Sequence, residues 1–138
     1  MTGAHDGPAP LRVLLVDDEP DVRFLLQIQM RLAGFDVIGT AANGAEAMDS
    51  CRRDPPDVVV LDLLMPTVNG FETIGMLQEE LPDVGIVAYT GVAGEFVRAE
   101  MERLGVEVVL KAGDSLALAD AVRRCVKRES SDPSSEPR

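Results

Sequence analysis

The sequence predicts an α/β fold in which a parallel sheet is covered by helices on both faces. Two observations support this. Short apolar segments alternate five times with segments of helical periodicity, and the apolar segments are too short to be helices. A repeated strand–helix unit implies parallel strands joined by right-handed crossovers. We expect one domain over residues 11–128, between a disordered leader (1–10) and a disordered tail (129–138) that carry no apolar stripe.

The first two strand–helix units have clear boundaries. "LRVLLV" (11–16) is a continuous apolar run typical of a buried strand, and "DVRFLLQIQMRLAG" (21–34) has helical spacing with Gly34 as its stop. "FDVIGTA" (35–41) is the second expected strand. "NGAEAMDSCRRD" (43–54) is the second helix, which two prolines bring to an end.

Three further units follow the same plan. "VVVL" is fully apolar, and the helix after it ends before Pro82. The fourth helix ends at Gly105, and the fifth is capped at its start by Asp114 or Ser115. The expected strands are 58–61, 85–90 and 106–110, and the expected helices are 70–81, 95–105 and 114–128.

Composition and charge exclude several classes of function. Of the 138 residues, 46% are hydrophobic and none is Trp, so the core must be aliphatic. The net charge of −11 argues against direct nucleic-acid binding, because a phosphate backbone requires a basic face. No apolar run could span a bilayer and the leader lacks the features of a signal peptide, so we expect a cytoplasmic protein without membrane insertion. Cys51 and Cys125 show no metal-ligand spacing and are expected to be reduced.

Four of the five expected strands end in side chains that can perform chemistry. Asp17 and Asp18 follow the first strand, Asp62 follows the third, Thr90 ends the fourth and Lys111 follows the fifth. In a flavodoxin-like sheet of order 2-1-3-4-5 these four strands are neighbours, and ligands bind beyond their carboxyl ends. Each residue alone has an ordinary explanation, such as a helix cap or a solvated side chain. Their joint placement favours a shared crevice.

The charges in this crevice indicate phosphoryl chemistry. Crowded carboxylates repel one another until a proton or a cation relieves them, and oxygen ligands with vacant positions suit Mg²⁺. A carboxylate can attack phosphorus to form an acyl phosphate. The incoming phosphoryl oxygens would be neutralised by the metal and by Lys111, and Thr90 could donate a hydrogen bond. Asp62 is the expected nucleophile.

Four segments together resemble the receiver domain of two-component response regulators. They are "LLVDDEPDVR", "PDVVVLDLLMPTVNGFE", "VAYTG" and "VVLKAG", and each lies at the expected strand end. The resemblance implies that Asp62 is the phosphoacceptor and that Asp17 and Asp18 hold Mg²⁺ with the backbone carbonyl of Leu64. It further implies that Thr90 is the switch hydroxyl and that Lys111 contacts the phosphoryl group.

The resemblance also implies a separate phosphodonor. Receiver domains are phosphorylated by a sensor histidine kinase, and the single histidine of this chain, His5, lies in the expected leader. Because nothing after Arg128 resembles an effector, we expect output by binding to a downstream protein. A homodimer through the surface of the fourth helix, fifth strand and fifth helix is a further option.

Two positions depart from the family pattern. Ala112 follows Lys111 where the family usually has a cis proline, and a cis bond before another residue costs about 3 kcal/mol. We therefore predict either a trans peptide with a rearranged loop or a strained cis bond. Val108 stands where the family usually has Tyr or Phe, so the usual coupling from Thr90 to an aromatic side chain is not expected.

The residues beside the phosphoryl site predict a long-lived phosphorylated form. Leu64 and Val92 each lie two residues after a site residue, Asp62 and Thr90, and neither can orient a water molecule. Pro66 is expected to limit the loop after Asp62, and Gly70 to allow a tight turn into the next helix.

Taken together, these features predict a phosphorylation-dependent signalling switch that catalyses only its own phosphoryl uptake and hydrolysis. Two alternatives stay open. One is a constitutive scaffold that is never phosphorylated, which Ala112 and Val108 favour. The other is a Mg²⁺-dependent phosphatase that works through an aspartyl phosphate, which the absence of an acid at Leu64 and of a cap segment disfavours.

Overall fold

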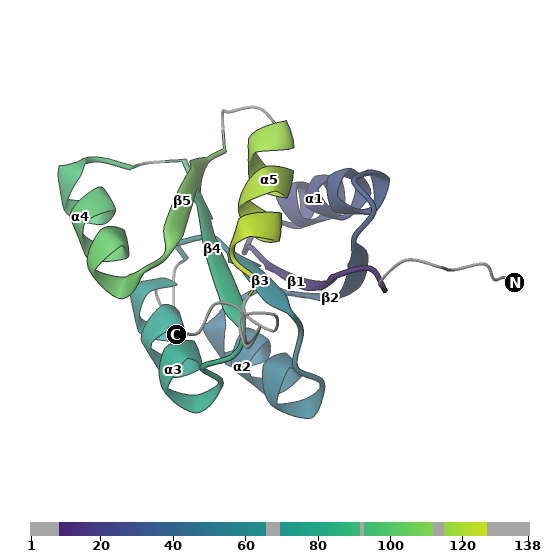
Figure 1. Ribbon diagram of the computed structural model, residues 1–138, viewed down its shortest axis with the longest axis horizontal. Coiled ribbons are helices and arrows are strands. Elements are labelled where there is room, and N and C mark those ends of the chain that lie inside the picture. The colour runs from purple at the N-terminus through teal and green to yellow at the C-terminus, as the bar shows by residue number, and fades with distance from the viewer. Residues whose placement is uncertain (1–8, 66–69, 92, 112–114, 127–138) are drawn as a thin grey trace, which may run out of the picture.

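The protein folds as five parallel strands in one sheet with helices on both faces, as the sequence predicts (Figure 1). The computed structural model describes residues 9–65, 70–91, 93–111 and 115–126. The strand order is β2-β1-β3-β4-β5, which confirms the predicted flavodoxin-like order. The strands are β1 (Arg12–Val16), β2 (Asp36–Ala41), β3 (Val58–Leu61), β4 (Gly85–Thr90) and β5 (Glu107–Leu110). The helices are α1 (Pro20–Leu32), α2 (Gly44–Arg53), α3 (Gly70–Glu80), α4 (Glu95–Leu104) and α5 (Ser115–Arg124).

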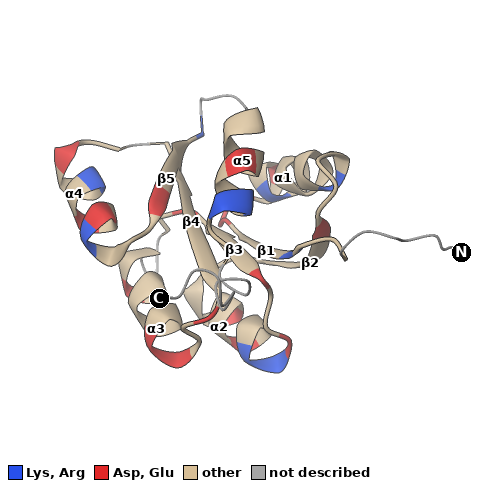
Figure 2. Ribbon diagram, viewed as in Figure 1, with Lys and Arg blue, Asp and Glu red and all other residues tan. Residues whose placement is uncertain are grey.

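Two hydrophobic layers enclose the sheet. Alternate residues of β3 point to opposite faces, so Val58 and Val60 pack with α1 and α5, whereas Val59 and Leu61 pack with α2, α3 and α4. All four residues of β3 are buried, because helices cover this central strand on both sides. The buried centre of the sheet is apolar, and charged residues lie on the helices and near the strand ends (Figure 2).

Most predicted boundaries agree with the structure to within about two residues, the usual uncertainty of a helix end. Gly34 and Gly105 have φ values of 96° and 73°, so both adopt the positive φ that a glycine after a helix allows. Asn43 caps α2 by accepting a hydrogen bond from the Glu46 amide, and Glu46 accepts one from the Ala42 amide.

The prediction for the last helix was too long. The sequence pattern extends to Arg128, but α5 ends at Arg124 and the next two residues are already outside the helix. The backbone of Cys125 packs directly against Gly85 at the start of β4. A Cβ atom on Gly85 would lie 2.4 Å from the Cys125 carbonyl oxygen. The chain therefore leaves the helix where it meets the sheet.

Candidate functional site

The carboxyl edge of the sheet brings together the side chains that follow β1, β3 and β5. Asp17 follows β1 directly, and its amide donates to the Ala41 carbonyl of the neighbouring β2. Asp62 follows β3, and its amide donates to the Val16 carbonyl of β1. Lys111 follows β5, and its amide donates to the Thr90 carbonyl. Ladder hydrogen bonds therefore continue one residue past these strands and hold each side chain at the same edge.

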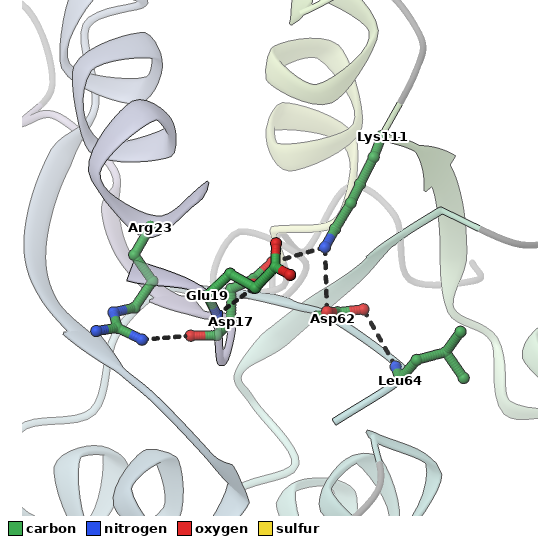
Figure 3. A network of polar contacts seen from close by, with 6 residues as sticks. All are labelled: Asp17, Glu19, Arg23, Asp62, Leu64 and Lys111. Atoms are coloured by element: carbon green, nitrogen blue, oxygen red, sulfur yellow. Dashed lines mark hydrogen bonds and ion pairs between the residues drawn. The ribbon is translucent and has the colours of Figure 1, made fainter. Parts of the chain in front are cut away.

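Lys111 links the two carboxylates (Figure 3). Its Nζ atom lies 2.8 Å from Asp17 Oδ2 and 3.1 Å from Asp62 Oδ2. The two acids are 0% and 5% exposed, and they are the only charged side chains that are buried among the described residues. Burying a carboxylate costs free energy unless the carboxylate is paired with a cation. Here two buried carboxylates share one ammonium group, so the site carries more negative than positive charge.

Two hydrogen bonds between side chains and the backbone hold the turn after β1. Asp17 Oδ1 accepts a hydrogen bond from the Glu19 amide at 2.9 Å. The Arg23 guanidinium, on the first turns of α1, donates to the Asp17 carbonyl at 2.8 Å (Figure 3). Arg23 is a contact that the sequence analysis missed. Its only signal was a basic residue six positions after an acid, which is too common to be informative.

Asp62 combines burial with contacts that favour its charged form. Burial raises the pKa of Asp62, and the nearby Asp17 carboxylate acts in the same direction. The Leu64 amide, which donates to Asp62 Oδ1 at 3.1 Å, and Lys111 act in the opposite direction without cancelling the rise in pKa. For Lys111, burial lowers the pKa, but its contacts with Asp17 and Asp62 outweigh burial and the pKa is raised. Lys111 is therefore held in its charged form, whereas the contacts of Asp62 offset only part of the cost of burying its charge.

The three acids have the composition and spacing of a divalent cation site. One carboxylate oxygen from each of Asp17, Asp18 and Asp62 lies within 4.8 Å of the others. The Oδ2 atom of Asp17 is buried, and the ion pair with Lys111 is its only polar contact among the described residues. Asp18 is partly exposed and leaves the cluster open to solvent. Hard oxygen atoms with unused lone pairs and an open side suit Mg²⁺, so the residues present fit this metal.

Gly70 is needed for a reason other than the predicted one. Its φ is not positive, so the turn does not require glycine's conformational freedom. Instead, α3 begins against the segment that follows Asp62. A Cβ atom on Gly70 would lie 2.5 Å from the Leu63 Cα and 2.8 Å from the Asp62 carbonyl oxygen, and the Gly70 amide donates to the Leu63 carbonyl. Close approach of two backbones, which sequence patterns do not reveal, explains this glycine.

Of the remaining predicted site residues, the structure describes Thr90 and Leu64. Thr90 is the last residue of β4 and is fully buried. Since Leu61 pairs with Ala88, Thr90 lies one residue beyond the level of Asp62 on the adjacent strand. The Leu64 side chain is 55% exposed. The predictions for Pro66, Val92 and the peptide between Lys111 and Ala112 fall outside the described residues.

A doubly covered parallel sheet with an acidic cluster and a lysine at its carboxyl edge has the features of a metal- and phosphoryl-binding domain of the doubly wound class, because ligands bind at this edge in such sheets. The family model for the response regulator receiver domain matches residues 13–123. The chain therefore belongs to the response regulator receiver family, as the four sequence motifs predict.

Known proteins with similar sequences or structures agree with this assignment. The chemotaxis protein CheY of Thermotoga maritima is 28% identical over 117 residues, which are 84% of this chain and 98% of that protein. The "Probable transcriptional regulator ycf27" of Porphyridium aerugineum is 32% identical over 85% of this chain and 48% of that protein. The crystallised chemotaxis protein CheY4 of Vibrio cholerae has a TM-score of 0.78 at 26% identity and covers 86% of this chain and 100% of its own.

The chain is shorter than several of its curated relatives. It matches 38%, 48% and 35% of three proteins named as transcriptional or response regulators.

None of the helices among the described residues is long and apolar enough to cross a membrane.

Proposed function

We propose that the chain is a phosphorylation-controlled signalling switch in which Asp62 accepts a phosphoryl group from a phosphohistidine of a sensor histidine kinase. One observation carries the proposal. The two buried charged side chains of the described structure come from neighbouring strands and share one lysine at the edge where ligands bind in this fold. A buried ion pair adds little to stability, whereas charged groups with shifted pKa values in a cleft are typical of functional sites.

Each residue has a role that follows from its chemistry. A carboxylate oxygen of Asp62 attacks phosphorus, the bond from phosphorus to the donor imidazole nitrogen breaks, and the imidazole keeps the electron pair and takes a proton from solvent. Lys111 already contacts Asp62 and would neutralise a phosphoryl oxygen. Thr90 would donate a hydrogen bond to another oxygen. Hydrolysis returns inorganic phosphate and the free Asp62 carboxylate.

Asp17, Asp18 and Asp62, with the backbone carbonyl of Leu64, would hold Mg²⁺. When bound, the metal supplies positive charge that neutralises phosphoryl oxygens. The buried Asp17 Oδ2 atom supports this assignment, because Lys111 is its only polar contact among the described residues and leaves it able to bind a cation.

Incubation with acetyl phosphate and Mg²⁺ tests the proposal. We expect one phosphoryl group on the unsubstituted chain, detected by intact mass, and none on Asp62→Asn. Continuous release of phosphate from small esters would instead support a phosphatase. A chain that is never labelled would support the constitutive scaffold and contradict the proposed switch.

The partners follow from the proposed chemistry. The phosphodonor is a histidine kinase, and the output is altered binding to a downstream protein rather than to nucleic acid, which the net charge of −11 disfavours. We place this signalling in the cytoplasm and regard the chain as a switch, not a metabolic enzyme. Dimerisation through α4, β5 and α5 is tested by sedimentation with and without phosphorylation, where a larger species only in the phosphorylated sample supports it.

A further inference from the structure

Two phenylalanine rings join α3 to α4 beside the proposed phosphoacceptor. The centroids of Phe71 and Phe96 are 6.3 Å apart, and the ring planes are tilted by 56°. Each is the second residue of its helix. This is the geometry that aromatic pairs favour. Phe71 packs against the core layer under α2, α3 and α4, whereas Phe96 is 71% exposed. Phe71 is therefore the anchored ring, and Phe96 is the ring that can move.

The backbone just before Phe71, the anchored ring, packs directly against the backbone of Asp62 and Leu63. Gly70 precedes Phe71, and the Gly70 amide donates to the Leu63 carbonyl at 2.9 Å. A Cβ atom on Gly70 would lie 2.8 Å from the Asp62 carbonyl oxygen, so no space separates the two backbones. Packed interiors transmit displacement because they have no voids to absorb it. A shift of the backbone at Asp62 and Leu63 must therefore move the start of α3, and Phe71 with it.

The helix on the other side of the ring contact is weakly anchored. Met101 is the one buried residue among the ten residues of α4, all of which the structure describes. By comparison, α3 buries four residues. The N-cap residue of α4 is Gly94, which has no side chain to cap the helix. A helix with few buried contacts rearranges at low cost.

The contacts beneath α4 are made by partly buried aliphatic side chains. Val108 of β5 packs against the same layer as Val97 and Leu104 of α4, and all three are partly buried. No aromatic ring occupies position 108 to carry a signal from Thr90. Of the aromatic residues described, Phe71 and Phe96 are the pair in ring contact with each other.

We propose that the Phe71–Phe96 contact holds α4 in its phosphoryl-free position and connects that position to the state of Asp62. The proposal rests on the proposed function of Asp62. A phosphoryl group on Asp62 shifts the 62–63 backbone, which moves Gly70 and Phe71 and loosens the hold on Phe96, so α4 moves. Coupling between two sites is reciprocal. Removing the ring at position 96 must then favour the phosphoryl-bound state.

Beryllofluoride with Mg²⁺, a non-hydrolysable phosphoryl mimic, tests this coupling. Its affinity for the chain is measured by ¹⁹F NMR of the bound fluoride. We expect Phe96→Ala to bind beryllofluoride about threefold to tenfold more tightly than the unsubstituted chain, which is the range expected for one aromatic pair. Phe96→Tyr keeps the ring and should keep the original affinity.

Phe24→Ala is the matched control. Phe24 is 63% exposed on α1, on the opposite face of the sheet, so the same truncation there should leave the affinity unchanged. Because Phe24 and Phe96 are both exposed, neither substitution should prevent folding, and circular dichroism checks this. An unchanged or weaker affinity for Phe96→Ala overturns the proposal.

Fluorine labels on the phenylalanines give a second readout. With 4-fluorophenylalanine at the four Phe positions, beryllofluoride should shift the resonances of Phe71 and Phe96 more than that of Phe24. Bound beryllofluoride with unmoved Phe71 and Phe96 signals overturns the inference but leaves the proposed function intact. Failure of the unsubstituted chain to bind beryllofluoride and to be labelled by acetyl phosphate overturns both.

Discussion

Asp17 and Asp62 are acids buried at one site, and burial disfavours the charged form of Asp62. Both contact Lys111, which is the only polar contact of Asp17 Oδ2 among the described residues. Removing one partner of a buried ion pair destabilises a protein when it leaves the other charge unpaired, but Lys111 would still pair with Asp17 if Asp62 were neutralised. We therefore expect an opposition between stability and activity at this site. Neutralising Asp62 should stabilise the fold and abolish the proposed activity.

Asp62→Asn tests this opposition. Burial raises the pKa of Asp62, which means that the folded chain disfavours the ionised carboxylate. Ionised Asp62 costs stability above its folded pKa, and the cost disappears as the pH falls through that pKa toward the unfolded value of about 4. We expect Asp62→Asn to be more stable than the unsubstituted chain at pH 7, with a smaller difference at pH 4.

Urea unfolding at the two pH values measures this difference. Asp49→Asn is the control, since the Asp49 side chain is 67% exposed and its substitution should change stability little. An Asp62→Asn protein that is less stable than the unsubstituted chain at pH 7 would show that the carboxylate serves folding.

We predict that Leu64 prolongs the lifetime of the proposed phosphoryl group. Its side chain is 55% exposed beside Asp62, where a polar group could orient the attacking water. We expect Leu64→Asn to hydrolyse its phosphoryl group at least about threefold faster than the unsubstituted chain, a modest share of the usual general-base effect. Loss of the label is followed over time after acetyl phosphate is removed. Leu116→Asn, which is 67% exposed on α5, is the control, and an unchanged rate for Leu64→Asn would remove the explanation.

At the scale of elements, the two glycines of α3 can be compared directly. Gly70 begins the helix against the backbone of Leu63, whereas Gly75 in the same helix has nothing within 4 Å of an added Cβ. We expect Gly70→Ala to lower the free energy of unfolding by about 2 kcal/mol through overpacking. Gly75→Ala should raise it by about 0.5–1 kcal/mol through helix propensity.

Chemical denaturation of the two variants measures both values. Equal effects at positions 70 and 75 would show that α3 can withdraw from the Asp62 segment, and would also weaken the inferred path to α4. A Gly70→Ala protein that keeps its stability would contradict the close approach directly.

Element boundaries were predictable where one residue type decides them. Gly105 has the positive φ that a C-terminal stop requires, and Asn43 caps α2 through its own side chain. The end of α5 was not predictable, because the packing of the Cys125 backbone on Gly85 joins residues 40 positions apart in the sequence. Local patterns carry no information about such a contact.

At the scale of the whole molecule, Mg²⁺ should stabilise the fold by binding only the folded chain. Asp17, Asp18 and Asp62 come from two strand ends and converge only after folding. At a Mg²⁺ concentration ten times the dissociation constant, the expected gain is about 1.4 kcal/mol, and EDTA should remove it.

Thermal unfolding at constant ionic strength measures the gain. Asp18→Asn should lose most of it, since Asp18 is partly exposed and its substitution leaves the core intact. Asp83→Asn, at the opposite end of the sheet, should keep it. A stabilisation that survives Asp18→Asn would place the metal elsewhere.

The sequence by itself determined the fold class and the edge of the sheet where the acids and the lysine lie. Alternating apolar periodicity specifies strands and helices, and parallel strands place Asp17, Asp62 and Lys111 at one end. The tertiary structure alone decided which atoms meet. Lys111 reaches both acids, Gly70 touches the Asp62 backbone and Phe71 meets Phe96. These contacts depend on how separate segments pack to within about an ångström. The periodicity of the sequence carries no information at that scale.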